Sequence, residues 1–460
     1  MIDTIKQGYN YYWKQWTKVR DVIDGGTEKL KDKAYIYLPK LPGQTEYDYK
    51  AYLQRAQFIN FSSRTFTAFI GQIFRKDPVI TNFNHTDFLE DVDLCGTNVD
   101  YYTRDILAEL LKVNRVGVLV DYSEEKKRPY LTTYKAENII NWRTEKVNGV
   151  NQLSLIVLKG VVLRPDPEDE YEEIEVVTYR KLFLEDGLYK VQDYEEKKTD
   201  QGTQHILVSK SEPLINNARF DFIPFYILTD SGLSDELKRS PLLDIVNVNL
   251  GHYINSADYE NALHFTGSST IITRGWGDTP FPVGGAANFP IEGGAEFLTR
   301  QGDDALEKGM RHKEEQMAIL GSTILSGRGK YIQSAESARI SSSGEFATLA
   351  NMSRALSASL TYVFKLVSDW YGDSNFKDVS VQFNTDFEVD GMDSQQLIAY
   401  MGAVQSGMLS EKAFFYTLQQ KEVYPDGWTF EDEKQAIEED NKKRIAKNDS
   451  EVADMYEADK

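Results

Sequence analysis

The sequence predicts an α+β protein, because helical and strand-like patterns occupy separate stretches of the chain. Apolar residues recur at helical spacing before Val116 and again after Ser240. Between these stretches, short runs rich in β-branched and aromatic residues alternate with charged turns, which predicts one mostly antiparallel β region. With 460 residues, of which 41% are hydrophobic, the chain is long enough for roughly two to four domains.

The composition limits the classes of function. The net charge is −20, from 72 acidic and 52 basic residues. Such a chain is not a general nucleic-acid binder, because nonspecific affinity comes from cationic side chains that neutralise phosphates. The single cysteine, Cys95, excludes an internal disulfide framework and any multi-cysteine metal site, and we expect a buried side chain rather than a nucleophile. The 27 tyrosines indicate a large contact surface.

Neither a membrane span nor a metal site is expected. No window approaches the ~18 consecutive apolar residues of a membrane helix, and the N-terminus MIDTIKQGYNYYWKQW lacks an apolar signal core, so we expect a soluble chain without a cleaved leader. The five histidines lack metal-ligand spacing. His252 and His264 share a predicted helix but lie about 18 Å apart along it, too far for one ion. We expect no metal and no cofactor.

Two helices are predicted with capping signals before the β region. The first begins with Thr45 as N-cap and Asp48 at the capping-box position, continues along one apolar face to Ile73, and is closed by Pro78. The second is NVDYYTRDILAELLKV. Earlier, four apolar residues already recur at helical spacing: Trp13, Trp16, Val19 and Val22.

The predicted strands are short and separated by charged turns. They are VGVLVDY, RPYLTTY, LSLIVLKGVVL, YEEIEVVTYRKLFL, GLYKVQDY and HILVSK, and the region ends near FIPFYIL. We expect the charge runs DPEDEYEEIE and EEKKTDQG at hairpin edges and tips, where they remain solvated.

After the β region the pattern is again mainly helical. Ser240 is the expected N-cap of a long helix, with Pro241 at its first position and Gly267 just past its end. A stretch dense in glycine and proline follows, and then a return helix with Asp303 and Asp304 in its first turn. The remainder predicts a very long helix with a kink at Ser341–Gly344, a strand in DVSVQFNTDF, and short helices with a charged tail.

The stretch GSTILSGRGKYIQSAES invites an interpretation as a phosphate-binding loop, but its spacing is wrong. That loop needs a glycine, four intervening residues, Gly-Lys and then Ser or Thr, whereas this chain has Ile324 at the first position and Tyr331 at the last. A predicted helix also precedes it where a strand is required. GWGDTP similarly fails as a dinucleotide motif, because Pro280 replaces the third glycine. We therefore expect no enzymatic activity and no catalytic residues.

In their order, these segments resemble a tailed-bacteriophage portal protein, in particular the subgroup long catalogued as an uncharacterised portal-like domain. The resemblance covers roughly residues 35–375, and the combination is specific although no single motif is diagnostic. It is carried by YLPKLPGQTEYDYKAYLQRAQFIN with GQIFRKDP, RVGVLVDY with RPYLTTYKAENIINWR, IPF, SPLLDIVNVNLGHYINSADYENALHFTG, EGGAEFLTRQGDDALEKGMRHKEEQMAILGSTIL and ESA.

The resemblance implies a portal fold with a defined division of the chain. The wing would comprise residues 1–239 and 337–390, the latter containing the long kinked helix and a strand. The two-helix stem would be 240–267 and 303–320, the clip 268–302, the tunnel loop 321–336, and the helical crown 391–460.

The resemblance also implies a homo-oligomeric ring of twelve subunits at one capsid vertex, without enzyme activity of its own. Its implied partners are double-stranded DNA passing through the channel, terminase, a head-completion adaptor, and the major capsid and scaffold proteins, with no membrane. The ring would be assembled in the host bacterial cytoplasm and reside in the virion. Rival interpretations are another virion structural protein, such as a capsid subunit or head–tail connector, or a DNA-processing enzyme.

Three groups of site residues follow from the resemblance. In the tunnel loop they are Ser326, Gly327, Arg328, Gly329, Lys330 and Tyr331, where the two cations either face DNA or pair with acids of the neighbouring subunit. In the clip, Trp276, Phe281 and Phe289 either contact the terminase or adaptor or pack within and between clips. On the return helix, Arg311 and Lys313 either face the channel or bridge to acids on the adjacent helix.

Overall fold

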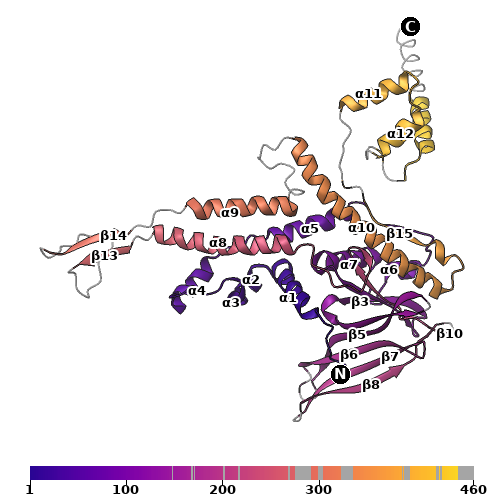
Figure 1. Ribbon diagram of the computed structural model, residues 1–460. Coiled ribbons are helices and arrows are strands. Elements are labelled where there is room, and N and C mark those ends of the chain that lie inside the picture. Colours follow the sequence, from indigo (N-terminus) through magenta and orange to yellow (C-terminus); the bar gives the residue numbers. More distant parts are fainter. Residues whose placement is uncertain are drawn as a thin grey trace, which may run out of the picture. The chain divides into compact units, whose positions relative to one another are not determined.

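The computed structural model confirms an α+β protein, which divides into two units, Met1–Thr385 and Asp386–Lys460 (Figure 1). The described residues are 1–147, 149–166, 169, 171–199, 202–215, 218–267, 270–274, 292–298, 304–322, 335–385, 387, 394–420, 424 and 427–443.

The N-terminal residues form a run of short helices. These are α1 (Tyr9–Arg20), a π-helical turn (Asp21–Gly25), α2 (Gly26–Asp32) and α3 (Ala34–Tyr37). Of the four residues predicted at helical spacing, Trp16, Val19 and Val22 are buried, whereas Trp13 is largely exposed.

The helix predicted from Thr45 to Ile73 is in fact two helices, α4 (Glu46–Arg55) and α5 (Phe61–Ile73). The predicted cap is confirmed, because the Thr45 hydroxyl accepts from the backbone N–H of Asp48. The chain leaves the helix at Ala56 and restarts at Asn60, whose side chain accepts from the N–H of Ser63 and donates to the carbonyl of Val22. These side chain–backbone hydrogen bonds override the apolar spacing that continues across the break.

The second predicted helix is confirmed as α7 (Val99–Val113). Asn98 caps its start, and Asn114 ends it in the left-handed conformation with φ 56°, which asparagine tolerates at this position. Before it lie β1 (Val79–Thr81) and α6 (Thr86–Glu90).

The prediction that Cys95 is buried is wrong: the residue is exposed. It lies in a surface turn in which aspartate side chains accept from backbone N–H groups. Asp93 accepts from Cys95 and Thr97, and Asp91 accepts from Gly96. Such Asx-type turns hold the chain at the surface, where a small apolar side chain gains no burial.

The single β region expected from the sequence consists of two antiparallel sheets. The first has the strand order β12-β11-β2-β3, and the second has the order β4-β5-β6-β7-β8. A short 3₁₀ turn at Ala136–Asn138 separates β3 from β4, a strand absent from our prediction. The strands are β2 (Val116–Ser123), β3 (Arg128–Lys135), β4 (Ile139–Val147), β5 (Val150–Pro165), β6 (Glu173–Glu185), β7 (Leu188–Thr199), β8 (Gly202–Ser211), β11 (Phe225–Thr229) and β12 (Gly232–Leu233), with a small β9–β10 hairpin at Leu214–Ile215 and Ala218–Arg219.

Both faces of the five-stranded sheet carry buried side chains. One face joins the four-stranded sheet through a cluster that includes Trp142, Ile156 and Phe225. At Gly117 an added Cβ would lie 2.3 Å from Phe225 Cζ, so this ring occupies the space of a side chain. The other face is covered by residues of the N-terminal segment, among them Tyr9 and Trp16. The described residues of the two charge runs lie at or beside hairpin ends, as predicted, where β5 meets β6 and β7 meets β8.

The two edges of this sheet differ. Beside β4, the Lys6 N–H donates to the carbonyl of Ile140 at 2.9 Å, and Asn141 Nδ2 donates to the carbonyl of Thr4 at 2.9 Å. The N-terminal segment therefore covers the first part of the β4 edge. In the part of the chain that the structure describes, β8 pairs only with β7.

A pair of long helices follows, α8 (Leu243–Gly267) and α9 (Asp304–Met317), which lie side by side (Figure 1). At about 1.5 Å per residue the 25 residues of α8 extend over roughly 38 Å. Between them β13 (Thr270–Arg274) pairs antiparallel with β14 (Gly294–Leu298). Ser240 does not cap α8 as predicted, because its hydroxyl donates to the carbonyl of Lys112.

The long helix is α10 (Ala335–Tyr371), which is continuous through Ser341–Gly344, where the sequence predicts a kink. The predicted strand is β15 (Ser380–Gln382), antiparallel to β1. Hydrogen bonds tie the strand to the helix: the Val381 N–H donates to the Thr361 hydroxyl and the Phe383 N–H to the Ser357 hydroxyl.

The second unit is helical, as predicted for this part of the chain. It contains α11 (Ser394–Gln405), α12 (Glu411–Gln420) and a helical stretch over 430–443. None of the helices in the described ranges of either unit is both long and apolar enough to cross a membrane.

Candidate functional site at the base of the long helix pair

Two of the three predicted groups of site residues lie outside the described residues. They are Ser326, Gly327, Arg328, Gly329, Lys330 and Tyr331, and the aromatic residues Trp276, Phe281 and Phe289. The third group lies on α9. Arg311 pairs with Glu307 of its own helix at 2.9 Å, not with an acid of the adjacent helix. Lys313 is half-buried, with its aliphatic chain against Gly251 of α8.

The contact between α8 and α9 depends on small residues. A Cβ added at Gly251 would lie 3.1 Å from Lys313 Cε, and one added at Gly309 would lie 3.3 Å from Asn255 Nδ2. Each helix therefore presents a glycine where the other places a longer side chain. The same contact contains His252, which is fully buried, has its Nε2 3.2 Å from Glu314 Oε1, and meets the Phe61 ring edge to face.

A π-helical turn, Ala318–Ser322, ends α9 at a glycine that no other residue can replace without strain. Gly321 has φ 147° and ψ −2°, a region open essentially only to glycine. An added Cβ would lie 2.8 Å from Thr65 Cγ2 and 3.1 Å from Phe69 Cζ, both on α5. Gly321 therefore fixes where the chain leaves α9.

We expect Gly321→Ala to lower the free energy of unfolding of the first unit by about 1–3 kcal/mol, because the substitution adds backbone strain and a clash with α5. Urea denaturation followed by tryptophan fluorescence measures the change. Gly71→Ala is the matched control: Gly71 is in α5 with no atom within 4 Å of an added Cβ, so alanine there should be neutral or stabilising. Equal stability of Gly321→Ala and the wild type would contradict the argument.

Helix α8 is also fastened to α4, α5 and the segment between them by polar side chains. Tyr52 donates to Asp258 Oδ1 at 2.7 Å, and Ser256 donates to the carbonyl of Gln57 at 2.7 Å. Asn249, which has no exposed surface, accepts from both the N–H and the hydroxyl of Ser62 and donates to the carbonyl of Ile59. These side chains satisfy the backbone groups left open where α4 and α5 are interrupted.

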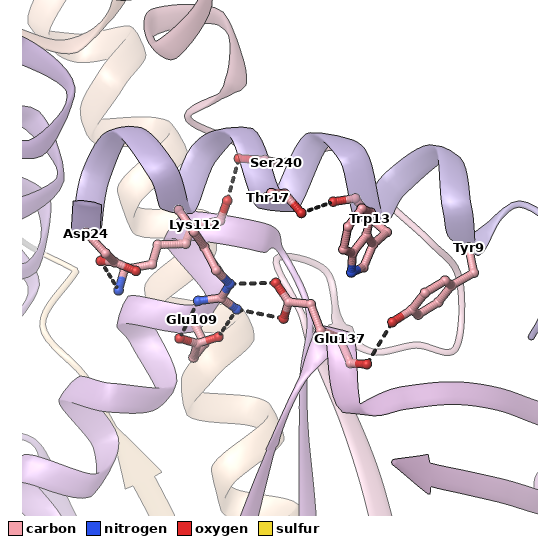
Figure 2. A network of polar contacts seen from close by, with 9 residues as sticks. Tyr9, Trp13, Thr17, Asp24, Glu109, Lys112, Glu137 and Ser240 are labelled. Carbon is pink, nitrogen blue, oxygen red and sulfur yellow. Dashed lines mark hydrogen bonds and ion pairs between the residues drawn. The ribbon is translucent and has the colours of Figure 1, made fainter. Parts of the chain in front are cut away.

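The C-terminal end of α7 organises a second set of contacts, which we call the α7 junction: Glu109, Lys112, Asn114 and Arg115 with their partners. Figure 2 shows the contacts around Glu109 and Lys112. Arg20 of α1 bridges the carboxylates of Glu109 and Glu137, with the shortest distance 2.6 Å in each case. Burial opposes the charge of Arg20, but the hydrogen bonds to these two glutamates outweigh it and raise the arginine's pKa. The bridge joins α1, α7 and the turn before β4.

Two further side chains, Lys112 and Tyr9, make contacts beside this bridge. Lys112 Nζ lies 2.7 Å from Asp24 and 5.1 Å from the centre of the Phe66 ring. The Tyr9 hydroxyl donates to the backbone carbonyl of Glu137 at 2.7 Å, and burial, followed by the Glu137 charge, raises the pKa of Tyr9 to about 12. The hydroxyl is therefore a permanent donor at neutral pH.

The junction also holds the segment that leads into α8. Ser240 donates to the carbonyl of Lys112 at 2.6 Å, and Asn114 Nδ2 donates to the carbonyl of Arg239 at 3.2 Å. Arg115, only 1% exposed, donates to the carbonyls of Asp235 and Glu236 and lies 4.1 Å from the Trp142 ring centre. Burial lowers the pKa of Arg115 to about 10. The position of α8 is thus set by α7 and β4.

The chemistry of this region is that of an anchor. Its side chains bind one another and backbone carbonyls, and within the described ranges no group of three or more His, Cys, Asp or Glu could hold a metal ion. From the sequence, Ser240 is expected only as a helix cap, and the other residues of the α7 junction carry no expected role. A usable signal was present in α8, where polar Asn249, His252 and Ser256 occupy positions three and four residues apart on the buried face.

Comparison with known proteins gives one family match. Residues 241–371 match the model described as "Domain of unknown function (DUF4055)". The matched range begins two residues before α8 and ends on the last residue of α10. It therefore corresponds to the helix pair with its connecting hairpin and the long helix that follows. The search of curated proteins gave no match.

Two solved structures are similar to the chain over most of its length. One, "Virion of native gene transfer agent (GTA) particle", has 12% sequence identity and a TM-score of 0.39, and covers 81% of this chain and 92% of that chain. The other, "Neck of empty GTA particle computed with C6 symmetry", has 12% identity and a TM-score of 0.40, and covers 84% of this chain and 95% of that chain.

Proposed function

We propose that the chain is a phage portal subunit, which assembles into a ring at one capsid vertex and forms the channel for genome packaging and ejection. One observation carries the proposal: the antiparallel pair α8 and α9 has the β13–β14 hairpin between its helices and is followed by the long helix α10. The order of these elements agrees with the order of stem, clip and long wing helix that the sequence resemblance implies. The ring also serves as the docking platform for terminase and a head–tail adaptor.

The surface of α9 suits an aqueous channel. Its contact with α8 uses a narrow strip, and its remaining positions are mostly charged and exposed, among them Asp304, Glu307, Arg311 and Glu315. The Glu307–Arg311 pair leaves that arginine partly neutralised within its own helix. The exposed carboxylates of α9 repel the phosphate backbone, which favours sliding of DNA over binding. Twelve copies at −20 each would carry −240 formally.

The contacts at the base of the helix pair support a mechanical role. The α7 junction and the polar contacts of Asn249, Ser256 and Asp258 fix α8 to the sheet region and to α4 and α5. A stem that carries the passage of DNA needs such an anchorage, because force on the helix pair must be borne by the rest of the subunit.

The proposal predicts a ring with a central hole when the purified full chain is examined by negative-stain electron microscopy. We also expect the purified protein to show no measurable ATP hydrolysis, since the proposal assigns ATP hydrolysis to the associated terminase. A chain that stays monomeric under all conditions would overturn the proposal. Rings that fail to support packaging, but join head to tail, would favour the alternative function of a head–tail connector.

Arg328 and Lys330 test the DNA-facing part of the proposal. We expect the double charge reversal Arg328→Glu with Lys330→Glu to reduce DNA packaging in a complementation assay while leaving ring assembly unchanged, because the cations face DNA in the channel. The matched control is Lys126→Glu with Lys127→Glu in the exposed turn between β2 and β3, which should leave packaging unchanged. Unchanged packaging after the loop reversal would remove DNA contact from the role of these two residues.

A further inference from the structure

The C-terminal unit buries few apolar side chains of its own. Among its described residues, the buried apolar side chains are Phe387, Phe415 and Leu418. A unit of this size needs a larger core, or a partner, to hold its fold. Its exposed large apolar residues, again among those described, are Leu397, Ile398, Tyr400, Met401, Met408, Tyr416, Trp428 and Ile437.

Half of these exposed residues lie on α11 and form a continuous arc around it. At about 100° per residue, Tyr400, Leu397, Met401 and Ile398 follow one another over roughly 160° of the helix surface. Tyr400, at one margin, meets Phe414 of α12 with ring centroids 6.4 Å apart. Ile398, at the opposite margin, is 68% exposed. The side of α11 away from α12 is therefore apolar and uncovered.

This helix is also free of charge. No Asp, Glu, Lys, Arg or His occurs from residue 394 to residue 410, whereas residues 390–460 as a whole hold 16 acidic and 8 basic residues. An acidic chain repels its own copies wherever carboxylates face one another. Copies of this chain can meet at the uncharged α11 without that cost. A basic partner, by contrast, would bind the acidic residues elsewhere on the unit and not the uncharged α11.

We propose that the flank of α11 formed by Leu397, Ile398 and Met401 is an interface between copies of this chain, through which neighbouring C-terminal units complete one another's apolar core. The inference rests on the proposed function, because a ring gives every unit a neighbour. It adds to that function the surface by which the C-terminal units associate.

An environment-sensitive thiol label tests burial of the flank directly. In a Cys95→Ser background, which removes the exposed native thiol, Ile398→Cys is labelled with bimane and the full chain is concentrated through its assembly transition. We expect the emission of the label to shift to the blue on assembly. The matched control, Ile437→Cys, is similarly exposed in the same unit and should show no shift. If the emission of the label at residue 398 is the same in the assembly as in the monomer, the residue stays exposed to solvent and the inference is overturned.

Substitution tests the contribution of the flank to assembly. We expect Ile398→Glu to raise the concentration for half-assembly by roughly tenfold or more, since a buried unpaired charge is strongly unfavourable. Ile398→Leu and Ile437→Glu should behave as wild type. Because both isoleucines are exposed in the single chain, circular dichroism should show all variants folded. If the wild-type chain never assembles, the proposed ring is overturned. If the wild-type chain forms a ring and Ile398→Glu assembles at the same concentration, only the α11 interface is overturned. A blue shift that appears only after another virion protein is added also overturns contact between copies.

Discussion

Replacing Arg20 by methionine is expected to lower the free energy of unfolding of the first unit by about 3–5 kcal/mol. Arg20 is the shared partner of two carboxylates, and its side chain is 18% exposed, with Glu109 at 10% and Glu137 at 23%. Removing the guanidinium leaves two largely buried negative charges facing one another. Most of the lost stability comes from the unpaired carboxylates in the variant, and less from the lost attraction between Arg20 and the two glutamates.

Urea denaturation of the purified chain measures this effect, with an exposed ion pair as the control. Arg311→Ala breaks the Glu307–Arg311 pair on the surface of α9, and it should change stability by no more than about 0.5 kcal/mol. Adding Glu109→Met and Glu137→Met to Arg20→Met should recover much of the loss, because apolar side chains can replace a buried ionic cluster. A loss below about 1 kcal/mol for Arg20→Met alone would contradict the role assigned to the bridge.

Replacing Asn249 by alanine is expected to cost about 2 kcal/mol or more. The substitution leaves two buried groups without a partner, the N–H and the hydroxyl of Ser62, and removes one of two donors from the carbonyl of Ile59, which still accepts from the Phe61 N–H. Each unsatisfied buried polar group typically costs about 1–3 kcal/mol. We also expect faster hydrogen exchange in the first turn of α5, because its Ser62 N–H loses its acceptor.

Asn247→Ala is the matched control on the same helix. Asn247 is exposed and accepts only from Lys18 Nζ at 3.1 Å, so alanine there should be neutral or slightly stabilising through its helix propensity. A double-mutant cycle with Ser62→Ala separates the terms: Ser62→Ala should cost much less in the Asn249→Ala background than in the wild type. Additive costs would show that the two side chains are not coupled.

Local signals in the sequence were sufficient for most individual elements. The Thr45 cap, the helix α7 and most of the long strands depend on neighbouring residues, so their patterns could be interpreted directly. The break between α4 and α5 was missed because the apolar spacing continues across it, while the side chain that restarts the helix also bonds to the distant Val22. Strand β4 was missed because the turn before it is only three residues long.

The candidate site could not be predicted because its partners are distant in the sequence. Arg20 meets Glu109 and Glu137 across 89 and 117 positions, and Ser240 meets Lys112 across 128. With 72 acidic residues in the chain, nothing in the sequence distinguishes Glu109 or Glu137 as a partner of Arg20. For Ser240, the local pattern predicted a helix cap, but its hydroxyl donates instead to the carbonyl of Lys112 on another helix. Burial and proximity, which decide these contacts, arise only after the chain has folded.

The N-terminal segment that covers the start of β4 has a consequence for how copies of this chain can accumulate safely. Open sheet edges template the addition of further strands, and a sheet open at both sides can extend without limit. Here residues Thr4 and Lys6 occupy the start of the β4 side, whereas β8, among the described strands, pairs only with β7. The covered start of β4 therefore works against fibril growth through this sheet when subunits reach the high local concentration that ring assembly requires.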